Sequence, residues 1–128
     1  MDAVSPDQRL GAFRATDAFA LEAYRLAGGL RGGGAAGLAD EIRRSAVTSG
    51  GAIVAASASA RGSEAERLHL ERARTALMES RYYLYVARRF AMLDPKTYRA
   101  LAARQDSALR ELEGVLGPVS APRATRPP

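Results

Sequence analysis

The most regular stretch of the chain runs from Ser63 to Leu93 and reads SEAERLHLERARTALMESRYYLYVARRFAML. Its apolar residues recur at steps of three and four, which is typical of an amphipathic helix. They form two adjoining stripes, one of Leu70, Ala73, Leu77, Leu84, Ala87 and Ala91, and one of Tyr83, Val86, Phe90 and Leu93. Ser63 and Glu66 have capping-box spacing, so the serine side chain is expected to accept from the Glu66 amide and Glu66 to reach back to the Ser63 amide. The pattern predicts one helix over 63–93.

A second helix is predicted directly after this stretch. Asp94 is a typical N-cap residue, and Pro95 suits the first helical position because its missing amide hydrogen has no partner there in any case. The helix is expected to end near Gly117 and Pro118. Its apolar face carries Tyr98, Leu101, Gln105, Ala108, Leu112 and Val115.

Two more helices are predicted before Ser63. The first begins at Pro6 or Thr16 and runs through Leu30, where a cluster of glycines disfavours further helix. The second runs from about Leu38 to Ala60, and Gly50 and Gly51 each weaken it by about 1 kcal/mol relative to alanine. Its inner stripe is mostly small: Leu38, Ile42, Ala46, Ser49, Ile53, Ala56 and Ala60. Small side chains in that stripe indicate that another backbone approaches closely.

Four helices joined by short turns, with no alternating strand pattern, predict an all-α fold. The expected architecture is an antiparallel up-down-up-down four-helix bundle over residues 1–117. Residues 118–128 contain prolines and arginines without an apolar period, so we expect a disordered tail.

The composition limits the kinds of protein this can be. Of 128 residues, 19 are basic and 14 acidic, a net charge of +5, and Lys96 is the single lysine. The absence of cysteine excludes disulfides and thiolate metal sites, and suits a reducing cytoplasm. Residues 1–7 lack the pattern of a signal peptide, and the longest uncharged run, 45–60, is too short and too polar to span a bilayer. We therefore expect a cytoplasmic protein with no membrane association.

The sequence contains no recognisable catalytic constellation. His69 is the only histidine, and Glu66-x-x-His69 has a metal-ligand spacing but lacks the second copy that a di-metal bundle needs. Residues 32–37 match G-x-G-x-x-G, but no strand precedes them, so an interhelical turn is expected. The predictions are no enzyme activity, no metal and no cofactor.

Arginines form the most suggestive feature for function. Arg67, Arg74, Arg81 and Arg88 recur every seven residues, so they lie in a slowly drifting column on one side of their helix. Arginine suits phosphate recognition, which favours RNA or DNA as a partner. Two alternatives remain: an exposed ion-pair lattice with neighbouring glutamates, and a genome-wide bias toward arginine. The candidate nucleic-acid-binding residues are Arg43, Arg44, Arg74, Arg81, Arg88 and Arg89.

Tyr82, Tyr83 and Tyr85 form the densest aromatic cluster. These positions point to three faces of one helix, so the rings cannot all enter one core. At least one is expected at the surface or at an interface, where tyrosine combines an apolar body with a polar tip. The three tyrosines are therefore the candidate contacts with another subunit or partner.

The stretch from Phe19 to Leu116 resembles the bacterial four-helix bundle family first noticed in intervening sequences of 23S ribosomal RNA genes. Arg43–Val47 is similar to the family's paired-arginine helix, Ala73–Glu79 to its third-helix motif Ala-x-x-Ser-Leu-x-Glu, and Ala87–Asp94 to the end of that helix. At Ala52–Ala56 the chain reads AIVAA where the family usually has Asn-Ile-Ala-Glu-Gly.

The resemblance implies a homo-oligomer, typically a ring of five bundles, without enzymatic activity. A related branch includes the accessory protein of diversity-generating retroelements, a basic pentamer that binds nucleic acid and a reverse transcriptase. The leading hypothesis is a non-enzymatic, homo-oligomeric accessory or scaffold protein that binds RNA or DNA. The alternative is a protein-interaction module, with no nucleic-acid role, whose partner docks on the small-residue helix or on the tyrosines.

Overall fold

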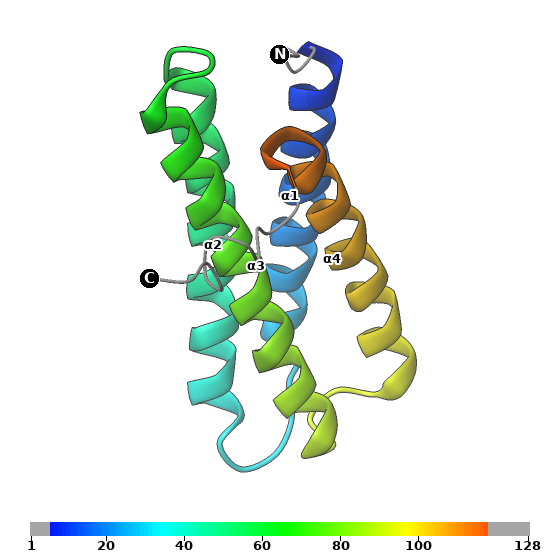
Figure 1. The fold of residues 1–128 in the computed structure, drawn as a ribbon. Coiled ribbons are helices and arrows are strands. Elements are labelled where there is room, and N and C mark those ends of the chain that lie inside the picture. Colours follow the sequence, from blue (N-terminus) through cyan, green and yellow to red (C-terminus); the bar gives the residue numbers. More distant parts are fainter. Residues whose placement is uncertain (1–5, 118–128) are drawn as a thin grey trace, which may run out of the picture.

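The computed structural model describes residues 6–117, which form four helices: α1 (Pro6–Ala27), α2 (Ala35–Ala58), α3 (Glu64–Arg89) and α4 (Pro95–Leu116). The helices alternate in direction, and α4 returns beside α1 (Figure 1). The predicted antiparallel all-α four-helix bundle is confirmed. The predicted disordered tail at 118–128 lies outside the described residues.

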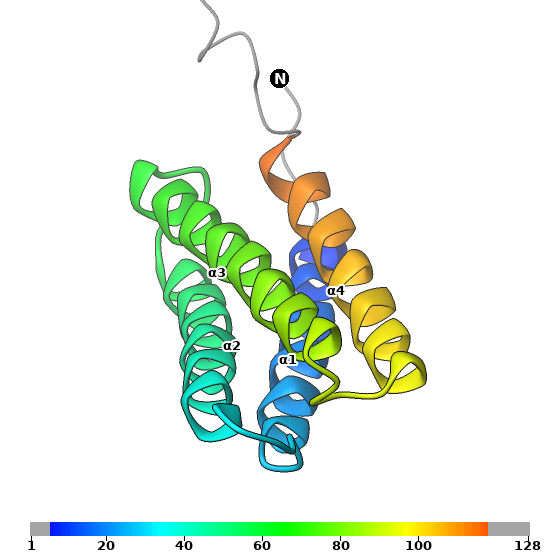
Figure 2. The same cartoon turned by 90° about the horizontal axis from the view of Figure 1, so that it is seen from below.

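Each helix packs against its two neighbours around the bundle, and the α2–α3 contact is the most extensive. Figure 2 shows this pair on one side and α1 with α4 on the other. The α2–α3 contact is lined by small buried residues, among them Ser45, Ser49, Ala76 and Ser80. Ser80 Oγ donates to Ser45 Oγ at 2.7 Å inside the contact. The small side chains therefore allow the close helix approach that the sequence indicated.

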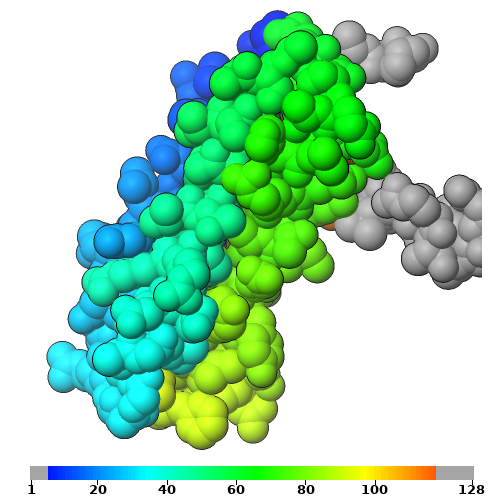
Figure 3. Space-filling view, turned by 90° about the vertical axis from the view of Figure 1, so that its left-hand side faces the viewer, coloured from blue at the N-terminus to red at the C-terminus, as the bar shows by residue number. Residues whose placement is uncertain are grey.

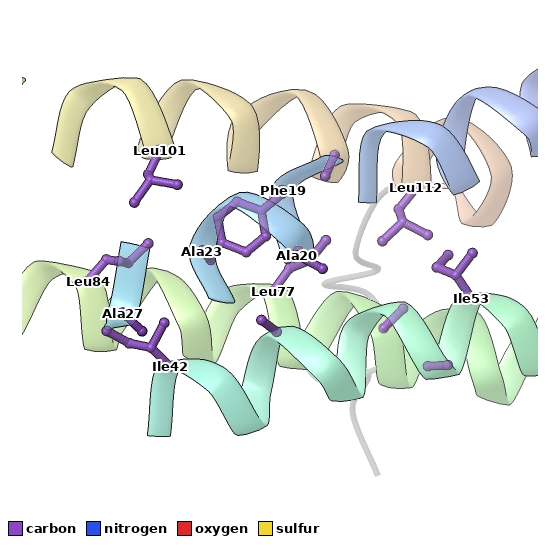
Figure 4. Packing of buried hydrophobic residues seen from close by; sticks show 14 of the residues in the cluster. Phe19, Ala20, Ala23, Ala27, Ile42, Ile53, Leu77, Leu84, Leu101 and Leu112 are labelled. Carbon is purple, nitrogen blue, oxygen red and sulfur yellow. The ribbon is translucent and has the colours of Figure 1, made fainter. Parts of the chain in front are cut away.

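The core is built from a few large side chains set among alanines. Phe19, Leu77, Leu84, Leu101 and Leu112 are fully buried and come from α1, α3 and α4. Figure 4 shows them converging between the helices, with Ile42 and Ile53 from α2. None of the helices in residues 6–117 has an apolar stretch long enough to cross a membrane.

The first two helices differ from the predicted bounds at their ends. Helix α1 begins at Pro6, the earlier of the two predicted starts, but ends at Ala27 rather than Leu30 because two glycines intervene. Helix α2 begins at Ala35 rather than Leu38, directly after Gly34 in a left-handed conformation (φ 83°). It ends at Ala58 rather than Ala60 because Ser59 is extended.

Helix α3 ends at Arg89, although the apolar pattern predicted helix to Leu93. Ala91 takes a left-handed conformation (φ 59°), and the Met92 amide donates to the Ala87 carbonyl at 2.8 Å. The Ala91 amide donates to the Arg88 carbonyl at 3.1 Å, which completes a Schellman motif. Leu93 is still buried because the turn brings it back onto the core.

The two predicted helix caps form, one of them with a different partner. Ser63 Oγ accepts from the Glu66 amide at 3.1 Å. Glu66 Oε1, however, accepts from the Gly62 amide at 2.8 Å, because the Ser63 amide already donates to the Ala60 carbonyl. Asp94 caps α4 as predicted, accepting from the Thr97 amide and hydroxyl at 2.8 Å each. These hydrogen bonds hold the pKa of the Asp94 carboxyl below its usual value.

Replacing Gly51 with alanine is expected to raise the free energy of unfolding by about 1 kcal/mol, since glycine disfavours a helix interior by that amount. A Cβ at Gly51 meets no atom within 4 Å, so the new methyl group causes no clash. Urea unfolding followed by circular dichroism measures the change.

The control for this prediction is Gly32→Ala. Gly32 has a φ of 108°, which an L-residue adopts only with strain, so this variant is expected to be less stable than the wild type. A loss of stability in Gly51→Ala would show that the α2 surface does not accept a side chain there.

Candidate nucleic-acid interface

The guanidinium groups of three of the four arginines in the predicted column are bonded to other residues of the bundle. Arg67 Nη2 forms an ion pair with Glu71 at 3.3 Å. Arg74 Nη1 donates to the Gly117 carbonyl at 3.4 Å, where it ties α3 to the end of α4. Arg81 also bonds to α4. Arg88, by contrast, is exposed, and its side chain has no ion pair or hydrogen bond within residues 6–117.

Arg81 connects α3 to α4. Its Nη1 forms an ion pair with Asp106 Oδ1 at 2.9 Å and donates to Gln105 Oε1, and its Nε donates to the Tyr98 hydroxyl at 3.4 Å. Partial burial lowers the pKa of Arg81, but the bonds to Tyr98 and Asp106 outweigh it and the pKa is raised. The Gln105 amide nitrogen donates in turn to the Leu77 carbonyl at 3.1 Å. This arginine therefore serves the packing of two helices and has few donors left for a ligand.

The paired arginines of α2 are also engaged. Arg43 Nε donates to the Tyr24 carbonyl at 3.4 Å, and its guanidinium lies 5.0 Å from the centre of the Tyr24 ring. Arg44 forms an ion pair with Glu41 at 3.2 Å. Arg44 is exposed, so this pair contributes little to stability, and it partly cancels the positive charge there.

Arg89 remains available to a ligand. Its Nη1 donates to the Tyr85 hydroxyl at 2.8 Å, and its guanidinium lies 5.8 Å from the centre of that ring. No carboxylate pairs with Arg89 within the described part of the chain. Arg88 and Arg89 are thus the two predicted site residues that keep an exposed, uncompensated positive charge at the end of α3.

Other basic side chains gather at the same end of the bundle. The α1–α2 connection and the end of α3 lie next to each other there (Figure 3), and the Arg31 amide donates to the Met92 carbonyl at 3.3 Å. The start of α4 adds Lys96 and Arg99. We call this region the basic end, and it consists of five exposed residues without an ion pair within 6–117: Arg31, Arg88, Arg89, Lys96 and Arg99.

A groove of about 640 Å³ opens at the basic end. Arg31 and Arg88 line it, and Met92 and Leu93 contribute apolar surface. Asp94 also borders the groove, but its carboxylate accepts from Thr97 and caps α4. The groove therefore presents two free guanidinium groups beside one carboxylate that is already bonded.

The opposite end of the bundle has a more balanced charge. The start of α1, the start of α3 and the end of α4 meet there. Their carboxylates, Asp7, Glu64, Glu66, Glu111 and Glu113, are interspersed with Arg9, Arg61 and Arg110. This end therefore carries side chains of both charges, whereas the five residues that define the basic end are all positive.

The three tyrosines occupy different environments. Tyr82 and Tyr85 are exposed, and Tyr83 is half-buried against the core. The expectation that at least one ring lies at the surface is confirmed. The Tyr82 ring packs edge-on against Tyr83 with centres 6.1 Å apart, and it lies 6.4 Å from Tyr85.

The remaining sequence motifs do not converge on a metal or nucleotide site. Glu66 turns toward Arg9 and the Gly62 amide, whereas the His69 ring contacts Arg72 Nη1 at 2.8 Å. Within residues 6–117 there is no group of three or more histidine, aspartate or glutamate side chains that could hold a metal ion. Gly32–Gly37 forms the predicted turn and the start of α2.

Sequence reasoning missed Arg31 and Lys96 as members of one surface. Arg31 stands among glycines, and nothing local indicates that its loop contacts the turn after α3. The seven-residue spacing of the arginine column, in turn, gave no indication that Asp106 on α4 forms an ion pair with Arg81.

A scan against protein-family models finds no match for this chain, and a search of curated proteins finds no similar sequence. The resemblance to the bacterial four-helix bundle family therefore stays a prediction.

Proposed function

We propose that this protein is a non-enzymatic, homo-oligomeric four-helix bundle that binds RNA or DNA through its basic end and acts as an accessory or scaffold. The observation that carries the proposal is the gathering of five exposed basic side chains, without ion pairs in 6–117, at one end of the bundle. The proposal places the protein in the cytoplasm, where its lack of cysteine suits the reducing conditions.

Binding through the basic end relies on the phosphate backbone. Each arginine fork bonds phosphate oxygens and releases condensed counterions, so affinity falls steeply with salt and depends little on sequence. Phe90, the most exposed of the large apolar side chains in 6–117, stands next to Arg89 and offers a face for a base to stack on.

Self-association strengthens such binding because several basic ends then act on one strand. The described residues include ten exposed large apolar side chains, which lie on α1, α2 and the α3 region. Tyr82 and Tyr85 lie next to each other among these side chains, and adjoining exposed apolar side chains of this kind support self-association. Five copies is the number that the family resemblance implies, and a reverse transcriptase is the protein partner that it implies.

Replacing Arg31, Arg88 and Arg89 with glutamine is expected to weaken binding of a fluorescent single-stranded RNA or DNA by at least about tenfold. If each arginine contacts one phosphate, the slope of log K against log salt becomes shallower by about 2, since each contact to single-stranded nucleic acid contributes about 0.7. Fluorescence anisotropy over a salt series measures both quantities.

The matched control replaces Arg14, Arg61 and Arg110 with glutamine. These arginines are also exposed, and the change in net charge is the same, but they lie away from the basic end. Equal weakening in both triple variants would refute a localised site and leave only a general charge effect. Arg81 is kept in both because its loss would disturb the α3–α4 contact.

The second candidate function is a protein-interaction module without a nucleic-acid role. The exposed apolar side chains Leu21, Val47 and Val54 favour it, because they lie on α1 and α2, away from the basic residues at the end of α3. This function predicts no nucleic-acid retention at ~150 mM salt and co-purification of one specific protein.

A further inference from the structure

A line of residues on the exposed side of α3 resembles the contact face of a paired helix, and we call this line the outer seam. Its seven residues follow alternating steps of three and four: Leu68, Glu71, Thr75, Met78, Tyr82, Tyr85 and Arg89. This spacing is typical of the contact line between two paired helices. The apolar centre of this outer seam is open to solvent, with Met78 54%, Tyr82 61% and Tyr85 41% exposed. No other helix of residues 6–117 covers it.

The side chains of the outer seam are already partly ordered. The rings of Tyr82 and Tyr85 lie 6.4 Å apart, and Arg89 donates to the Tyr85 hydroxyl. Glu71 at the other end is held by Arg67. An ordered surface of methionine, tyrosine and arginine has the composition of a protein interface core and loses little side-chain entropy on binding.

We infer that the outer seam pairs with the same seam of a second copy, antiparallel and about a two-fold axis that crosses the exposed face of α3 between Met78 and Tyr82. The inference rests on the homo-oligomer of the proposed function and assigns it two copies, in place of the five that the family resemblance implies. A two-fold contact is self-complementary, so each residue pair occurs twice.

The charges of the seam select one register. With the axis in this position, Tyr82 faces Met78 of the second copy, Tyr85 faces its Thr75, and Arg89 faces its Glu71. The thioether then packs against an aromatic ring, and the two ends close with opposite charges. The Arg89 guanidinium has five N–H donors, so pairing with Glu71 still leaves donors for a phosphate. A shift by one heptad sets Tyr82 against Glu71 or Met78 against Arg89, which places a charge against an apolar side chain.

The residues that flank the seam modify the contact. On the α4 side, Arg81 faces its own symmetry mate and Arg74 faces Arg88 of the second copy. Arg74 and Arg81 are drawn onto α4 by the Gly117 carbonyl and by Asp106, which reduces this repulsion. On the α2 side, Glu79 lies beside the two-fold axis and faces its own symmetry mate. Repulsion between these two carboxylates weakens the pairing, so Glu79→Gln is expected to tighten it.

The first test is the mass of the wild type and its variants by analytical ultracentrifugation over a concentration series. The expected wild-type species is twice the 13.6 kDa of one chain. Tyr82→Arg places a charge in the apolar centre and raises the dimer dissociation constant by at least about tenfold, as loss of a central contact does. Leu21→Arg, on an equally exposed apolar residue of α1, leaves it unchanged.

The second test uses disulfide trapping, which is clean because the chain has no cysteine. Thr75→Cys combined with Tyr85→Cys is expected to give a covalent dimer on mild oxidation, since the two positions face each other only between copies. Leu68→Cys combined with Tyr85→Cys cross-links efficiently only in the register shifted by one heptad, and serves as the control.

Two results would overturn the inference while leaving the proposed function standing. One is an oligomer of any size, five chains included, that is insensitive to Tyr82→Arg, and the other is preferential cross-linking of the Leu68→Cys/Tyr85→Cys variant. A wild type that stays a single chain at ~100 μM would remove the seam and the homo-oligomer together. Nucleic-acid binding is measured separately and decides the rest of the proposed function.

Discussion

Replacing Phe19 with alanine is expected to lower the free energy of unfolding by about 4 kcal/mol, because a large buried side chain leaves both lost burial and a cavity. Phe19 is 0% exposed and lies at the centre of the core (Figure 4). Its neighbours Ala20 and Ala23 on α1 are too small to fill the space it leaves. Since domains of this size are stable by roughly 5–15 kcal/mol, the variant is expected to be close to unfolding at 37 °C.

The control for Phe19→Ala is Phe90→Ala. Phe90 is 72% exposed, so its truncation is expected to change the free energy of unfolding by less than about 0.5 kcal/mol. Urea denaturation of both variants, followed by circular dichroism, gives the comparison. Equal losses would mean that the arrangement of the core around Phe19 is wrong.

Replacing Glu66 with alanine is expected to lower the free energy of unfolding by about 3 kcal/mol, because it leaves a partly buried cation without its partner. The Glu66 side chain is 8% exposed and forms an ion pair with Arg9, whose side chain is 19% exposed. Glu66 Oε1 also accepts from the Gly62 amide, so the change removes a bond that holds the α2–α3 turn. Burial lowers the pKa of Arg9, and the Arg61 charge lowers it further.

Two variants separate the ion pair from a general charge effect. Glu64→Ala removes an exposed carboxylate from the first turn of the same helix and is expected to cost only about 0.5 kcal/mol. The double variant Arg9→Leu with Glu66→Leu is expected to be more stable than Glu66→Ala, since no unpaired charge remains. A double variant less stable than the single one would contradict this assignment.

Helix existence and most of the core faces could be predicted from the sequence because apolar periodicity reports them directly. The end of α3 could not, since the left-handed turn falls on Ala91, where glycine would have been the recognisable signal. The apolar residues of 90–93 fit the helical spacing although they form a turn, because the turn brings Leu93 back onto the same core.

The features of the site that could not be predicted depend on contacts between residues far apart in the sequence. Glu66 was predicted as half of a capping box, but its Oε1 accepts from the Gly62 amide instead, and its Oε2 pairs with Arg9 from the start of α1. Arg81 was predicted as a nucleic-acid-binding residue, and only the packing of α4 brings Asp106 to it. Arg88 and Arg89 remained in the candidate site because no element of residues 6–117 brings a carboxylate to pair with them.

The central claim is that copies of this bundle associate and present their arginines to nucleic acid. Light scattering coupled to size exclusion, with and without prior nuclease treatment, tests it most directly. The account predicts a mass of at least two 13.6 kDa chains that persists after nuclease, and additional bound nucleic acid when nuclease is omitted at low salt. A mass of 13.6 kDa under both conditions, with no absorbance from nucleic acid, would contradict it.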